Sequence, residues 1–169
     1  GSGRAVPEKV LTNADLEKIV DTNDKWITER TGIKTRHVAE PGTALSDLAV
    51  EACQQALADA GCAPEEIDLI ILGSVTGDMK FPATACVIQE KLGAKNATAF
   101  DVSAACSGFL YGLHISEGLM LTGNYRRVLV IGGEILTSMV NWKDRDTCVL
   151  FGDGAGAVNG PCVQRQPVP

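Results

Sequence analysis

The sequence predicts an α/β fold in which helices cover both faces of a largely parallel sheet. Two segments, residues 67–75 and 127–132, are apolar almost throughout, which is typical of central strands buried on both sides. Helical patterns at 46–60 and at about 106–121 alternate with these strands, and such alternation is the signature of this class. The connections between parallel strands should then be right-handed crossovers.

Short elements are expected at the start of the chain. Residues 1–8 are rich in Gly and Pro and predict an extended segment. Thr12 is followed three residues later by Asp15, which is the spacing of a capping box and predicts that a short helix begins there. A weak alternation of side chains over 33–38 predicts a short strand.

A second short helix is predicted over residues 22–30, with Gly32 as its stop. Trp26 and Arg30 are four residues apart, so they share one face of this helix. An aromatic core residue with an arginine beside it is the more ordinary interpretation. A flat ring beside a cation would also suit an aromatic, phosphorylated ligand.

Two longer helices follow. Ser46 is expected to cap a helix over 46–60, whose apolar residues recur at helical spacing. Phe81 and Pro82 are expected to open the next helix, because proline is favoured in the first turn, and Gly93 should end it.

Cys106 stands at the junction between a predicted strand at 97–102 and the helix that follows. The unpaired N–H groups and the dipole at the start of a helix stabilise a thiolate, which is the nucleophilic form of cysteine. Ligands of open α/β sheets bind at the carboxyl ends of parallel strands, where this junction lies. Cys106 is therefore our candidate for an acyl-accepting nucleophile, the alternative being a small buried thiol.

The last part of the chain is less regular. A polar loop at 141–146 precedes a short strand expected at 148–151. The Gly-rich run at 152–158 lacks the strand–turn–helix context of a phosphate loop and indicates closely packed backbone instead. From there three prolines and no periodicity predict an irregular tail over 159–169, so residues 1–158 are expected to form the folded half-domain, with an incomplete first strand.

Composition limits the classes of function. The net charge of −6 argues against nucleic-acid binding, which requires a basic face. No run of 18 apolar residues is present, so no membrane span is expected, and no secretory signal is recognisable. The six cysteines include no C-x-x-C pair, which favours reduced thiols in a cytosol-like compartment and argues against zinc or another metal.

Several motifs, in the same order, resemble those of β-ketoacyl-acyl carrier protein synthase III, the condensing enzyme that starts fatty-acid synthesis in bacteria and plastids. They are Thr12-Asn-Ala-Asp-Leu-Glu, Trp26 to Arg30 followed by Thr-Gly-Ile, Phe81-Pro-Ala-Thr-Ala-Cys, Phe100-Asp-Val-Ser-Ala-Ala-Cys-Ser-Gly-Phe, and Leu150-Phe-Gly-Asp-Gly-Ala-Gly-Ala. That family has the thiolase fold, in which two similar halves form a five-layered αβαβα body. The resemblance implies that this chain is the N-terminal βαβαβαβ half.

The resemblance also implies a reaction. Cys106 would take an acetyl or other short acyl group from acyl-CoA, and its backbone N–H would help to hold the thioester oxygen. Malonyl-acyl carrier protein would then lose CO₂, and the resulting carbanion would attack the acyl-enzyme to give a β-ketoacyl-carrier protein. The resemblance implies no cofactor beyond these substrates, a homodimer when the protein is full length, and a cytoplasmic or plastid-stromal location.

Further site residues follow from the same match. The residues that would bind CoA are Thr22, Trp26, Arg30 and Arg145, with the adenine held between Trp26 and Arg145. Phe81 matches a residue that reaches across the family's dimer interface toward the neighbouring acyl pocket, and Phe151 matches a pocket residue.

The chain departs from the family at its second catalytic group. Family members carry a catalytic His and Asn in their second half, whereas this chain has only His37 and His114, and neither matches that His. The chain alone is therefore expected not to condense, although Cys106 could still be acylated slowly. The alternatives are a starter-unit condensing enzyme of polyketide-type biosynthesis and a non-catalytic partner subunit. A stand-alone binding module is the weakest alternative, since it would expose a large apolar face.

Overall fold

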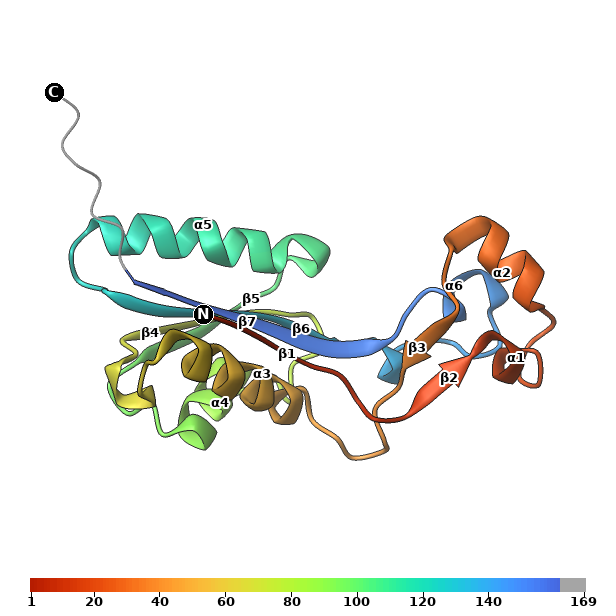
Figure 1. The fold of residues 1–169 in the computed structure, drawn as a ribbon, viewed down its shortest axis with the longest axis horizontal. Helices are drawn as coiled ribbons and strands as arrows, with labels where there is room; N and C mark the ends of the chain where they lie inside the picture. Colours follow the sequence, from red (N-terminus) through yellow and green to blue (C-terminus); the bar gives the residue numbers. More distant parts are fainter. Residues whose placement is uncertain (162–169) are drawn as a thin grey trace, which may run out of the picture.

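The computed structural model describes residues 1–161, which form a three-layered αβα body with a small lobe at one end (Figure 1). The strands are β1 Ser2–Ala5, β2 Val10–Thr12, β3 Thr35–His37, β4 Leu69–Gly73, β5 Thr98–Val102, β6 Arg127–Ile135 and β7 Asp153–Pro161. The α-helices are α1 Asn13–Leu16, α2 Asp24–Thr31, α3 Leu45–Ala60, α4 Thr84–Leu92, α5 Gly108–Leu121 and α6 Arg145–Cys148. Short 3₁₀ turns lie at Pro64–Glu66, Ala105–Ser107 and Leu136–Ser138.

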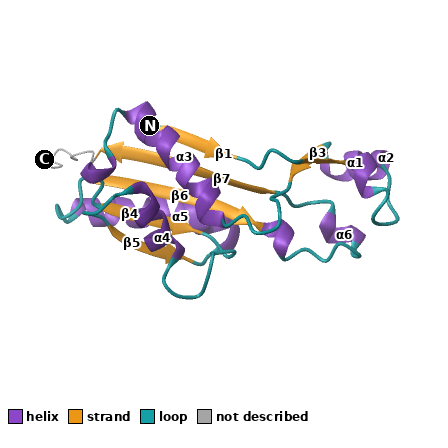
Figure 2. Ribbon diagram, turned by 90° about the horizontal axis from the view of Figure 1, so that it is seen from below, coloured by secondary structure: helices purple, strands orange, loops and turns teal. Residues whose placement is uncertain are grey.

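The body is built on a five-stranded sheet in the order β1-β7-β6-β4-β5 (Figure 2). β4 pairs in parallel with both β5 and β6, while β7 runs antiparallel between β6 and β1. The predicted α/β class is confirmed, and the sheet is mixed rather than wholly parallel. Helix α5 covers one face, and α3 and α4 cover the other (Figure 1).

Central burial explains why β4 is apolar throughout. All five of its residues are buried, because helices lie on both faces and strands on both edges. On one face Ile70 and Leu72 join the core under α3 and α4, and on the other Ile71 packs with residues beneath α5. Alternate residues of one strand therefore hold the two helical layers together.

The C-terminal strand corrects two expectations. The Gly-rich run that was expected only as closely packed backbone forms most of the strand β7. Residues 159–161, expected to be irregular, belong to the same strand and pair with β6 as far as Arg127. The rest of that expected tail, residues 162–169, lies outside the described residues.

The segment before β7 forms helix α6, whereas the sequence pattern predicted a strand at 148–151. The Asp144 carboxylate accepts from the Asp146 N–H at 3.1 Å and from the Thr147 hydroxyl at 2.6 Å, which starts a short helical turn. Local side-chain capping thus overrides the apolar, strand-like run that follows it.

Two helix starts differ from the predictions. Ala44, and not Ser46, is the N-cap of α3, and Ser46 lies inside the helix with its hydroxyl 2.7 Å from the Lys91 ammonium. Helix α4 begins at Thr84, after the Phe81–Pro82 peptide instead of at it. Its first N–H groups are bound by a side chain distant in sequence, because Asp101 accepts from Thr84 and Ala85 at 2.8 Å each.

The small lobe consists of the antiparallel pair β2–β3 with α1, α2 and α6 (Figure 1). Its centre is the buried Arg36 guanidinium, which donates to the Asn13 Oδ1 at 2.9 Å and to the Val149 carbonyl at 3.0 Å. Burial lowers the pKa of Arg36, and these acceptors compensate for its lost hydration. Among the helices of the described part of the chain, none is long and apolar enough to cross a membrane.

Candidate active site

Cys106 lies in a sharp corner between β5 and α5. The corner is a single 3₁₀ turn, Ala105–Ser107, and the α-helix itself begins at Gly108, two residues after the cysteine. Ala105 has a φ of +46°, in the left-handed region that side chains other than glycine rarely adopt. This strained backbone turns Cys106 outward, and its side chain is exposed.

Backbone contact between a strand and a helix holds the corner in place. A Cβ atom added to Gly73, at the end of β4, would lie 2.4 Å from the Gly108 carbonyl carbon and 2.6 Å from the Phe109 nitrogen. Only glycine at position 73 lets the start of α5 approach β4 this closely. The close contact at the end of the central strand therefore fixes the distance between the sheet and the Cys106 corner.

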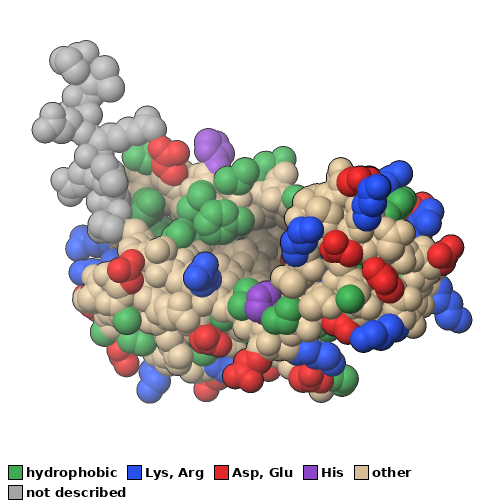
Figure 3. All heavy atoms as spheres, turned by 45° about the vertical axis from the view of Figure 1, so that its right-hand side comes forward, with side chains coloured by type: hydrophobic (Ala, Val, Ile, Leu, Met, Phe, Trp, Pro, Cys, Tyr) green, Lys and Arg blue, Asp and Glu red, His purple; other side chains and the backbone are tan. Residues whose placement is uncertain are grey.

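An apolar cavity of about 640 Å³ opens beside Cys106. Besides glycines and residues of β1 and β7, its walls include Val75, Cys106, Phe109, Glu134, Leu136 and Phe151. In Figure 3 the molecule is hollowed between the α5 side, where hydrophobic side chains gather, and the small lobe. Leu110 and Tyr111 of α5 are more than half exposed, at 64% and 55%.

The two predicted pocket residues occupy different places. Phe151 contributes to the wall of the cavity that holds Cys106. Phe81 does not: it lies in the loop before α4, and it is 87% exposed. Its neighbour Met79 is also exposed, at 52%, so this loop presents a second, separate apolar surface.

Trp26, Arg30 and Arg145 come together in the small lobe. Each guanidinium carbon lies 4.5 Å from the centroid of the Trp26 ring, so two cations contact one aromatic side chain. Arg145 also donates to the Asp21 carbonyl at 3.3 Å. Arg145 touches the indole directly, and no gap for another ring remains between them.

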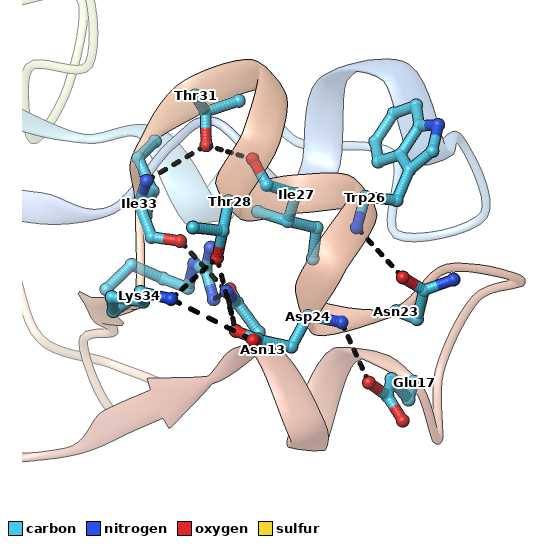
Figure 4. A network of polar contacts seen from close by, with 11 residues as sticks. Asn13, Glu17, Asn23, Asp24, Trp26, Ile27, Thr28, Thr31, Ile33 and Lys34 are labelled. Atoms are coloured by element: carbon cyan, nitrogen blue, oxygen red, sulfur yellow. Dashed lines mark hydrogen bonds and ion pairs between the residues drawn. The ribbon is translucent and has the colours of Figure 1, made fainter.

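Capping bonds orient Trp26 on helix α2 (Figure 4). The Asn23 side chain accepts from the Trp26 N–H at 2.8 Å, and the Glu17 carboxylate accepts from the Asp24 N–H at 2.9 Å. The left-handed Gly32 ends the helix, as predicted. At the other end, just before the N-cap Asn23, the buried Oγ1 of Thr22 has no hydrogen-bond partner among the described residues.

The two histidines of the chain lie apart from the cavity. His37 sits on β3, where its Nδ1 is 2.6 Å from the Pro7 carbonyl oxygen. His114 is on α5, with its side chain 89% exposed. Neither contributes to the cavity wall at Cys106. Within residues 1–161, no three His, Cys, Asp or Glu side chains are grouped as metal ligands would be.

Sequence reasoning missed one polar residue of the cavity. Glu134 lines the wall, and its carboxylate binds the loop that follows β4. A charged residue two positions after the apolar run 127–132 of a central strand was the signal that could have identified it. Chain order alone does not show that this carboxylate turns toward a loop some sixty residues earlier.

Comparisons with known proteins agree on one family. Residues 100–159 match the family model described as 3-oxoacyl-acyl-carrier-protein (ACP) synthase III. A beta-ketoacyl-acyl-carrier-protein synthase III of Caldanaerobacter subterraneus subsp. tengcongensis is 62% identical over 157 residues, which are 93% of this chain and 47% of that protein. The chain thus spans about half the length of the curated relatives it matches.

Solved structures show the same likeness. The 3-oxoacyl-acyl-carrier-protein synthase III of Aquifex aeolicus superposes with a TM-score of 0.94 at 53% identity, over 98% of this chain and 53% of that one. The priming beta-ketosynthase of the R1128 polyketide biosynthetic pathway superposes with a TM-score of 0.92 at 38% identity, over 100% of this chain and 50% of that one.

Proposed function

Because the chain belongs to the β-ketoacyl-acyl carrier protein synthase III family, we propose that it carries the acyl-accepting part of a condensing enzyme that initiates fatty-acid synthesis. The observation that supports this proposal most directly is the exposed Cys106 at a strained strand–helix corner beside an apolar cavity of about 640 Å³. A thiol so placed is open to a thioester, and the cavity suits the apolar part of a short acyl group.

The proposed half-reaction is a thioester exchange. The Cys106 thiolate attacks the acyl-CoA carbonyl carbon, and the carbonyl oxygen, which gains negative charge, is held by the Cys106 N–H at the corner. The tetrahedral intermediate then collapses, CoA leaves as its thiolate, and the acyl group remains on sulfur. The acyl-CoA supplies everything that this step needs, so it requires no cofactor.

The Trp26 cluster is the proposed CoA site. An indole with two guanidinium groups offers stacking surface for an adenine and positive charge for phosphates. The Thr22 hydroxyl has no partner among the described residues but is buried, so it would contact the nucleotide only by becoming exposed as the ligand enters. Arg145 stacks on Trp26 in this structure, so adenine would enter between them by moving Arg145 outward by the thickness of one ring.

Replacing Arg145 with alanine tests the CoA site. We expect R145A to weaken binding of CoA about tenfold, because one cation–π partner of the adenine is lost. Isothermal titration with CoA measures the change. The matched control is K143A, which removes a cation from the same loop without removing a contact to Trp26. Equal weakening by both variants would mean that net charge, and not stacking, binds CoA.

The experiment that tests the proposed function separates acylation from condensation. Incubation with acetyl-CoA should add one acetyl group to the chain, detected by intact-protein mass spectrometry and located on Cys106 by peptide mapping. Addition of malonyl-acyl carrier protein should then yield no β-ketoacyl product, since neither His37 nor His114 lies at the cavity. Robust product from this polypeptide alone would contradict the second expectation, and no acetylation would contradict the first.

The proposal extends to the assembly and its setting. We propose that the exposed Phe81 and Met79 meet a second copy in a homodimer of the full-length protein, where Phe81 reaches the neighbouring acyl pocket. We place the reaction in the bacterial cytoplasm, with malonyl-acyl carrier protein as the second substrate.

One other function has specific support: the similarity to a priming beta-ketosynthase of polyketide biosynthesis makes chain starting in such a pathway the second candidate.

A further inference from the structure

Glu134, at the carboxyl end of β6, binds the loop that follows the neighbouring strand β4. Its carboxylate accepts from the Val75 N–H at 3.0 and 3.2 Å, from the Thr76 N–H at 3.0 Å and from the Ser74 hydroxyl at 3.1 Å. The Thr76 hydroxyl donates to it as well. Three consecutive residues of the loop are therefore held by one side chain.

The bound loop forms part of the cavity beside the candidate nucleophile. Val75 lines the cavity together with Cys106 and Glu134. The hydroxyl of Thr76 also accepts from the Ile135 N–H at 2.8 Å, so the loop and the end of β6 are tied together at two points. The position of the Val75 side chain in the wall is thus set by the carboxylate of Glu134.

We propose that Glu134 is a positioning residue for acyl transfer, which holds Val75 in the cavity wall and so limits the length of acyl chain that fits beside Cys106. This inference rests on the proposed function, because the acyl chain whose length is limited is the one that Cys106 would receive. Glu134 acts through the loop and takes no part in the chemistry at sulfur.

The opposite end of the same strand pair offers a matched comparison. Asp68, just before β4, accepts from the Arg126 and Arg127 N–H groups at 2.8 and 3.1 Å, where β6 begins. Asp68 and Glu134 thus fasten β4 to β6 at opposite ends of the sheet. Only Glu134 lies at the cavity, so a purely structural role predicts similar behaviour when either carboxylate is neutralised.

The test uses alkylation of Cys106, which needs no acyl-CoA. The thiolate attacks the methylene carbon of an iodoacetamide, an S–C bond forms and iodide leaves, so the rate reports how well each reagent fits beside sulfur. We compare iodoacetamide with its N-hexyl derivative by mass spectrometry of the Cys106 peptide. In E134Q the ratio of the N-hexyl rate to the iodoacetamide rate should rise about tenfold, because the wall is released, whereas in D68N it should stay within about twofold of wild type.

Two results would overturn the proposal: an unchanged ratio in E134Q, or an equal rise in D68N. If E134Q does not fold, V75A removes the wall itself and should raise the same ratio, and an unchanged ratio there would also refute the proposal. A parallel comparison of acylation by acetyl-CoA and by hexanoyl-CoA tests the proposed function separately from the role of Glu134. No acylation by either thioester, together with the expected alkylation ratios, refutes the proposed function and leaves the positioning role of Glu134 standing.

Discussion

Replacing Cys106 with alanine is expected to lower the rate of acetyl transfer from acetyl-CoA to the chain by roughly a thousandfold or more, the scale of loss found when a covalent nucleophile is removed. The structure presents this thiol at a strained corner beside the cavity, and alanine truncates the side chain at Cβ and so removes the sulfur. Single-turnover mass spectrometry of the intact chain measures the effect.

The other cysteines supply the control. Burial raises the pKa of the Cys53 thiol to about 12, and burial together with the Asp144 carboxylate raises that of Cys148, so neither forms a nucleophile readily near neutral pH. Cys86 is only partly buried and contacts the Ala99 carbonyl, at 3.6 Å. C86S should therefore acylate at the wild-type rate, and residual acylation of C106A at a rate close to wild type would show that a different group accepts the acetyl.

Replacing Gly73 with alanine should have a large effect on stability. The new Cβ would have to lie 2.4 Å from the backbone of Gly108, and neither the central strand nor the start of α5 can yield without losing core contacts. We expect the free energy of unfolding to fall by about 3 kcal/mol, the upper range for overpacking a core. Urea unfolding followed by circular dichroism measures it, and acetylation of Cys106 should slow as the corner shifts.

Gly118 provides the matched control on the same helix. It lies on the exposed side of α5, and a Cβ added there would meet no atom within 4 Å. G118A should stabilise the chain by about 0.5–1 kcal/mol, because alanine loses less backbone entropy than glycine in a helix. If G73A and G118A changed stability alike, the backbone contact between β4 and α5 would not be what holds the corner.

Local patterns predicted the elements whose own residues determine them. The capping box of Thr12 and Asp15 and the left-handed stops at Gly32 and Gly93 occur as expected. The start of α4 was mispredicted because Asp101, on another strand, binds its first N–H groups. The folded region was ended too early, at residue 158, because pairing with β6 keeps residues 159–161 extended.

The candidate site likewise combines residues that the sequence predicted with one that only the fold reveals. The motifs around Cys106 and Phe151 led to two residues that the fold places at one cavity. Helical spacing put Trp26 beside Arg30, and the resemblance placed Arg145 with them. The structure brings both guanidinium groups onto the same ring. Glu134 was missed because its role depends on which strand lies next to β6, and a strand's neighbours are set by the sheet order.

The sequence by itself determined the thiolase-like α/β class, the family and the candidate nucleophile, because these depend on apolar periodicity and on motifs that are contiguous in the chain. Only the tertiary structure decided that Cys106 stands in a 3₁₀ turn that ends before its α-helix begins, that Arg145 closes directly on Trp26, and that Glu134 binds the loop after β4. These features arise from contacts between residues far apart in the chain, whose geometry local propensity does not encode.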